Sequence, residues 1–243
     1  GPDQEVSDLL VRAAKLSGRR GGLAVAVKWL RRAAELNPDP QRRERLFGDA
    51  VFVAARAGKL DDTRDLLDSG VGVPAGSASA ILADAYREFH RNGDAVSAHG
   101  WLLDGLSRAS SLDDKIVSRL AHLLVSVTNY LGDEQHWVKT NAALAAVDNR
   151  LNPAILMYRT GVDDIASTSI ALRTALLGEY AEKLPRLYAR QVMLLAFPAY
   201  CVDAMDQFRG PLRIAYTRLR EYGASIDAIE AGRVVMLDLF ASG

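Results

Sequence analysis

The sequence has little of what many function assignments depend on, beginning with cysteine, net charge and long apolar runs. Cys201 is the only cysteine among 243 residues, which excludes an intramolecular disulfide. The longest apolar run, 192–202, is shorter than the ~20 residues of a membrane span and contains Pro198. We therefore expect a helix buried between its neighbours, with Cys201 as a small buried hydrophobe. A formal net charge of zero removes the general electrostatic reason for nucleic-acid binding.

Motifs for catalysis, nucleotide binding and metal binding are missing as well. The chain contains neither the Gly-x4-Gly-Lys-Ser/Thr phosphate loop nor the Gly-x-Ser-x-Gly elbow of a serine nucleophile. The sequence has four histidines, His90, His99, His122 and His136. They lack the His-x3-His spacing of metal ligands. The sequence therefore predicts no enzyme activity, no cofactor and no metal.

Residues 20–68 carry the clearest structural signal, because they predict three helices separated by explicit breaks. The first helix has one apolar stripe, made of Leu23, Ala26, Val27, Leu30, Ala33 and Ala34. Pro38 and Pro40 end this helix, since a proline disfavours helical backbone in the residue before it. Gly58 supplies a stop for the second helix, and the pair Asp61 and Asp62 opens the third.

Glycines at the ends of apolar runs divide the rest of the chain at intervals of 35 to 46 residues; they are Gly18, Gly58, Gly93, Gly132, Gly178 and Gly223. Such intervals are typical of repeated two-helix units of tetratricopeptide or HEAT size. Strand patterns are nearly absent. We predict an all-α protein, with a tetratricopeptide-like, right-handed solenoid of antiparallel helix pairs forming a single domain over 4–243. The expected helices are 4–17, 22–36, 40–57, 60–68, 76–91, 94–109, 113–131, 134–147, 153–159, 163–177, 184–202, 205–221 and 225–240.

Three pairs of adjacent carboxylates invite an acid–base or metal interpretation: Asp61 with Asp62, Asp113 with Asp114, and Asp163 with Asp164. Each pair stands at an expected helix start, where a carboxylate accepts hydrogen bonds from unpaired N–H groups and meets the positive helix end. Neighbouring helical residues also point about 100° apart, so an adjacent pair does not form a two-carboxylate site. We therefore interpret all three pairs as helix caps.

The segment RGGLAVAVKWLRRAAELNPDPQRRERLFGDAVFVAARAGKLDDTRDLLD, residues 20–68, resembles the start of the tetratricopeptide-like region in large ATP-binding LuxR-type regulators. These regulators are abundant in actinobacteria and related to the maltose regulator of enteric bacteria. Residues 202–231 are similar to later repeats of the same region, although more loosely. In that family an ATPase of the STAND class precedes the repeats and a LuxR-type helix-turn-helix comes after them, and neither domain is present in this sequence.

The resemblance implies that the chain is the signal-sensing part of a transcriptional regulator. The repeats would bind a small-molecule inducer or a protein partner and pass this signal to the ATPase and DNA-binding domains of the parent chain. We expect no direct contact with nucleic acid or membrane, and a cytoplasmic location because no signal peptide is visible. Residues 1–2 look like a protease-cleavage scar, so we expect a fragment of a larger protein. The alternative is a general peptide-binding tetratricopeptide scaffold, such as the C-terminal region of some bacterial serine/threonine kinases.

Aromatic residues are the remaining candidates for recognition. The resemblance implies that Trp29 is a large core residue. If the first helix of each pair lines a concave surface, as in tetratricopeptide arrays, then one groove would contain Tyr86, His90, His122 and Tyr130. Packing between helices is the competing interpretation for all of these residues.

Overall fold

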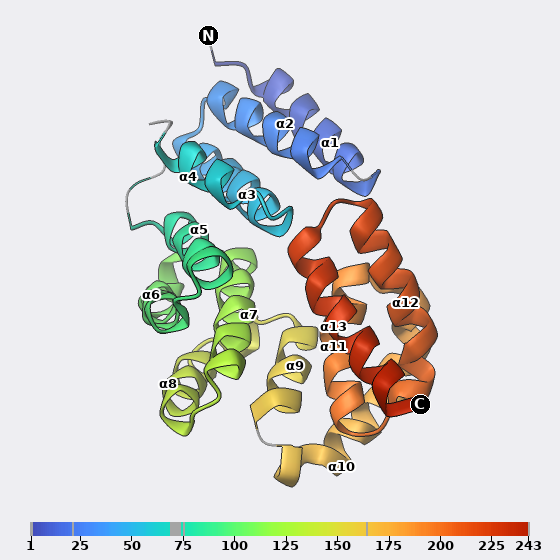
Figure 1. The fold of residues 1–243 in the computed structure, drawn as a ribbon. Helices are drawn as coiled ribbons and strands as arrows, with labels where there is room; N and C mark the ends of the chain where they lie inside the picture. The colour runs from blue at the N-terminus through green and yellow to red at the C-terminus, as the bar shows by residue number, and fades with distance from the viewer. Residues whose placement is uncertain (1, 21, 69–73, 75, 164, 243) are drawn as a thin grey trace. The chain divides into compact units, whose positions relative to one another are not determined.

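The computed structural model describes the whole chain except residues 1, 21, 69–73, 75, 164 and 243. The described residues form helices and connecting loops, without strands, so the protein is all-α (Figure 1). The α-helices are α1 Gln4–Arg19, α2 Leu23–Leu36, α3 Pro40–Arg56, α4 Leu60–Asp68, α5 Ala78–Arg87, α6 Ala95–Ser107, α7 Asp114–Leu131, α8 Glu134–Ala145, α9 Pro153–Asp163, α10 Ile165–Ala175, α11 Ala189–Cys201, α12 Met205–Glu221 and α13 Ser225–Ser242.

Short π and 3-10 segments interrupt or extend this helical pattern. Two π turns come directly after α5 and α10, and they are η1 Glu88–Asn92 and η4 Leu176–Tyr180. The 3-10 segments are η2 Ala109–Ser111, η3 Asp148–Arg150 and η5 Ala181–Arg186. Gly178 therefore lies inside a π turn, where we expected a helix end. By contrast, Gly93 and Gly132 end their helices in the left-handed conformation, at φ of 74° and 72°.

The chain divides into two compact units of helices. The first unit comprises Gly1–Ala143 with Glu221–Ala224, and the second comprises Leu144–Arg220 with Ser225–Gly243. Apolar stripes show which face of each helix is buried, but they do not show which helices share a core. The sequence pattern consequently predicted the helices without this division.

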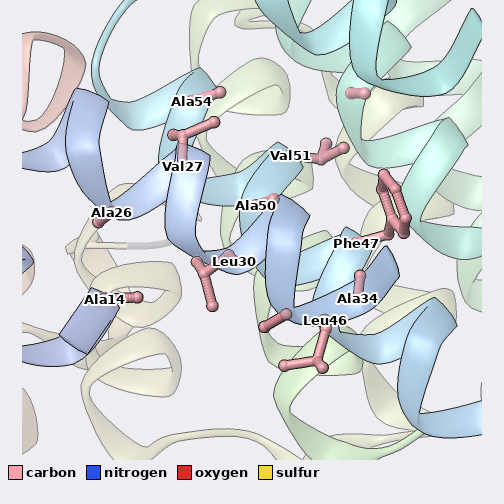
Figure 2. Close-up of a cluster of buried hydrophobic side chains, with 12 residues drawn as sticks. Ala14, Ala26, Val27, Leu30, Ala34, Leu46, Phe47, Ala50, Val51 and Ala54 are labelled. Atoms are coloured by element: carbon pink, nitrogen blue, oxygen red, sulfur yellow. The ribbon is translucent and has the colours of Figure 1, made fainter. Parts of the chain in front are cut away.

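The core of the first unit begins with the stripe of α2. All six predicted residues of this stripe, from Leu23 to Ala34, are buried. All of them except Leu23 belong to a cluster with residues of α1, α3 and α5, which includes the fully buried Phe47 (Figure 2). Small residues dominate the cluster, so the helices approach each other closely; its members are Ala14, Ala26, Val27, Leu30, Ala33, Ala34, Leu46, Phe47, Ala50, Val51, Ala54 and Ala83.

Alternate helices of the first unit also lie side by side. Helix α3 packs against α5, and α5 packs against both α6 and α7. Helix α7 is central, because nearly every residue from Ile116 to Thr128 is buried. The N-terminal ends of α3 and α7 therefore come near the start of α5, and this is where the candidate site lies.

The second unit has its own core and its own close helix contact. Helix α9 packs against α10 and α11, and α11 packs against α13. At the crossing of α9 and α11, a Cβ added to Gly161 would lie 2.4 Å from Cβ and 2.7 Å from Cα of Pro198. Only glycine therefore permits this approach. Arg209 of α12 and Asp238 of α13 join the last two helices through bonds of 2.7 and 2.9 Å.

Candidate functional site

The first unit has an open hollow of about 460 Å³ between α3, the start of α5 and the start of α7. Its lining balances three acidic and three basic side chains, and it consists of Gln41, Glu44, Arg45, Gly48, Asp49, Ala78, Ser79, Ser111, Leu112, Asp113, Lys115, Ile116 and Arg119. A second hollow of about 370 Å³ shares Glu44, Ala78, Ser111 and Leu112 with the first. We call the two together the α3–α7 groove. Its size and mixed charge suit a polar small molecule or a short extended peptide.

An ion cluster holds the two main walls of the groove together. Both carboxylate oxygens of Asp49 on α3 accept from Lys115 Nζ, at 2.7 and 2.8 Å. Arg119, one turn further along α7, reaches the same carboxylate at 2.8 Å. Its guanidinium also lies 4.0 Å from the centre of the Phe52 ring. Arg119 is therefore fixed between Asp49 and Phe52, whereas Lys115 is exposed to a ligand.

The floor of the groove depends on a glycine. Adding a Cβ to Gly48 on α3 would place it 2.3 Å from Oγ of Ser79, which is buried near the start of α5. A larger residue at position 48 would therefore require the Ser79 side chain to move or α3 and α5 to separate. The local sequence thus sets the depth of the hollow as well as its charge.

Aromatic residues continue from the ion cluster along the same helices. Tyr86 meets the Phe52 ring edge-on, with ring centres 6.4 Å apart, and stacks on His90 at 5.6 Å. Phe89 in turn contacts both His90, at 4.7 Å, and Tyr130, at 5.4 Å. Tyr86, His90 and Tyr130, three of the four residues that the sequence predicted to line one groove, are thus connected through Phe89. Phe89 was not singled out from the sequence. The π turn at 88–92 places Phe89 there.

The predicted residues do not, however, form one open surface. Tyr86 is 2% exposed and His122 is 3% exposed, whereas Tyr130 is 68% exposed. Helix α7 is packed on several sides, so a residue on its expected groove face, such as His122, is covered. Trp29 was expected in the core, but it is 39% exposed and lies at the edge of the core. The exposed part of the groove is formed mainly by charged residues.

A separate buried polar network joins α6, α7 and α8. His99 Nε2 lies 2.9 Å from Thr140 Oγ1, which lies 2.8 Å from Thr128 Oγ1. The Thr128 hydroxyl donates to the Leu124 carbonyl, so it accepts from Thr140, and Thr140 then accepts from His99. The network therefore makes Nε2 of His99 the donor to Thr140.

Burial and neighbouring charge both oppose protonation of His99. Burial, followed by the nearby His136, lowers the pKa of His99 to about 4. His136 lies edge-on at 4.7 Å between ring centres, and its Nδ1 lies 2.5 Å from Asp133. Hydrogen bonds from His136 lower the pKa of Asp133. We assign this network a structural role, since it satisfies polar groups inside the unit.

The carboxylate pairs have mixed outcomes. Asp113 caps α7 as expected, accepting from the backbone N–H of Ile116 at 3.0 Å. Asp61 and Asp62 lie in the first turn of α4, where Asp61 also forms an ion pair with Arg91. The prediction for Asp163 is wrong, because this residue ends α9 instead of starting the next helix. Its neighbour at 164 lies outside the described residues.

Cys201 is partly buried, and burial raises the pKa of its thiol to about 11, so it is protonated at neutral pH. Among the described residues, no group of three or more histidine, cysteine and carboxylate side chains is arranged to hold a metal ion. None of the described helices combines the length and apolar character needed to cross a membrane.

Comparisons of the chain with protein-family models, curated proteins and solved structures find no match.

Proposed function

We propose that this chain is the ligand-binding, helical-repeat segment of a LuxR-type transcriptional regulator, and that the α3–α7 groove receives its inducer or protein partner. The observation that carries the binding role is the open hollow of about 460 Å³ with its mixed charge. The side-by-side packing of α3 with α5 and of α5 with α7 supports a tetratricopeptide-like array. The regulator context rests on the resemblance of residues 20–68. No catalytic step is assigned to the chain.

The ion cluster suggests how binding would be transmitted. Asp49 belongs to α3, whereas Lys115 and Arg119 belong to α7, so a ligand that contacts Lys115 acts on both helices. A ligand with a carboxylate competes with Asp49 for Lys115, while Arg119 stays fixed against Phe52. Different affinity for two arrangements of α3 and α7 would shift their populations and so couple the groove to the domains of the parent chain.

A general peptide-binding scaffold, for example from a bacterial serine/threonine kinase, is the second candidate. It is favoured by the way the two hollows share four lining residues, because together they suit an extended chain better than a compact small molecule. The coding sequence of the parent protein separates the two candidates. A phosphate loop upstream and a helix-turn-helix downstream support the regulator, and a kinase catalytic domain upstream supports the scaffold.

The groove itself is tested by Lys115→Ala in the full-length parent, using a reporter gene that the parent controls. We expect a weaker response to the inducing signal with little loss of stability, since Lys115 is 60% exposed. Lys183→Ala is the matched control, because Lys183 also forms an exposed ion pair, with Glu179, but lies in the second unit. An unchanged dose–response curve for Lys115→Ala, in a parent of normal abundance, would refute the proposed site.

A further inference from the structure

Helix α13 presents a strip of exposed apolar side chains on the second unit. The strip consists of Ile229, Met236, Leu239 and Phe240, which are 69%, 70%, 51% and 91% exposed. Their spacing places them along one side of the helix, opposite its buried residues Ala231 and Val234. Exposed apolar side chains gathered on one side of a helix make it a candidate interaction site. We call these four residues the α13 strip.

Arginines border the α13 strip along both edges. On α12, helical spacing puts Arg213 and Arg220 on the same side as Arg209 and Tyr216. That side faces α13, since Arg209 pairs with Asp238 and a Cβ at Gly232 would lie 3.1 Å from the Tyr216 ring.

The other edge lies on α13 itself, where Arg233 is one turn from Ile229. Its guanidinium lies 5.2 Å from the centre of the Phe197 ring.

Three aspartates near the strip form ion pairs, and two of them are buried. Asp227 and Asp238 are 1% and 5% exposed, and they pair with Arg190 and Arg209. The exposed Asp206 also pairs with Arg209, at 3.3 Å. The exposed basic side chains along the two edges are Arg213, Arg220 and Arg233, and Glu230 beside Arg233 is half-buried.

We propose that the α13 strip binds a partner α-helix whose apolar stripe is flanked by acidic residues. The strip spans residues 229–240, which corresponds to about 16 Å, or three helical turns. It is one helix wide, so its shape fits a single amphipathic helix, and its arginine edges complement glutamate or aspartate beside that stripe. A second copy of this chain, docked through a twofold axis, would bring the same arginines together.

The test uses two synthetic probes of about 16 residues with leucines at helical spacing. One probe carries glutamates on both sides of the leucine stripe, and the other carries lysines. Fluorescence anisotropy measures their affinity for the full chain. We expect the acidic probe to bind at least about tenfold more tightly than the basic probe, with affinity falling as salt is added.

Four variants assign the binding to specific side chains. Met236→Glu and Arg213→Glu should each weaken the acidic probe by about tenfold or more. Two controls should leave its affinity unchanged: Ile170→Glu, at an isoleucine that is 83% exposed on α10, and Arg218→Glu, on the opposite side of α12. Circular dichroism confirms that each variant keeps its helices.

Several outcomes would overturn the proposal. These are no binding of the acidic probe, equal binding of both probes, or affinity that Met236→Glu leaves unchanged. A dimer seen by analytical ultracentrifugation and broken by Met236→Glu would assign the strip to a second copy instead. Co-sedimentation with phosphatidylserine vesicles that Met236→Glu abolishes, without binding of the acidic probe, would assign it to a membrane surface.

Discussion

Acid should destabilise the first unit through His99, and the structure allows the size of this effect to be worked out. The imidazole titrates near 6.5 in an unfolded chain but at about 4 in the fold, because it is buried beside His136. Below pH 6.5 the unfolded chain therefore binds a proton that the folded chain does not, and stability falls as pH falls. The loss is about 2 kcal/mol between pH 7 and pH 5, and about 3 kcal/mol by pH 4.

Carboxylates also contribute to acid unfolding, so the measurement needs a variant that removes His99 alone. His99→Gln keeps an N–H donor for Thr140 but does not titrate in this range. Urea unfolding at pH 7 and pH 5, followed by tryptophan fluorescence, reports on the first unit, because Trp29, Trp101 and Trp137 all belong to it. The wild-type chain should lose about 2 kcal/mol more than His99→Gln between these pH values. Equal losses in the two proteins would refute the reasoning.

Three further predictions rest on burial and close contact. Tyr86→Ala should cost about 3 kcal/mol or more of unfolding free energy, whereas Tyr130→Ala, at a side chain that is 68% exposed, should cost little; thermal melts would decide. Gly161→Ala should destabilise the second unit by about 1–3 kcal/mol, because its Cβ would overlap a proline of α11. Gly178→Ala should not destabilise the unit, because a Cβ there meets nothing within 4 Å. Circular dichroism melts compare the two variants, and equal melting temperatures would contradict the close contact. Cys201 should react with iodoacetamide far more slowly than free cysteine at pH 7.5, because its thiol has a pKa of about 11 and stays protonated. Labelling of the folded chain at the rate of an exposed thiol would contradict the burial of Cys201.

The helices could be predicted from sequence because their signals are local. Apolar periodicity, prolines such as Pro40 and capping residues such as Asp113 act within a few positions, and all thirteen expected helices are present, with ends shifted by a few residues. The α2 stripe shows the same point, since each of its predicted residues is buried. Such local signals do not indicate which helices group together in each of the two units.

The candidate site could not be predicted in the same way, because it depends on distant pairings. Asp49 and Lys115 are 66 positions apart, and neither residue stands out in its own segment. The presence of an aromatic side chain in the sequence also failed to indicate whether that side chain is exposed in the structure. Neighbouring helices cover Tyr86, whereas Trp29, which lies outside the buried stripe of α2, is partly exposed.

The aromatic contacts around Phe89 depend on the number of residues in the π turn at 88–92. A π turn holds about one residue more than an α-helical turn, so it rotates the later residues by about 100° around the helix axis. The contacts of Phe89 with His90 and Tyr130 therefore depend on the number of residues between α5 and Gly93 as much as on their identity. A chain shortened by one residue here would keep every aromatic side chain and still lose their alignment.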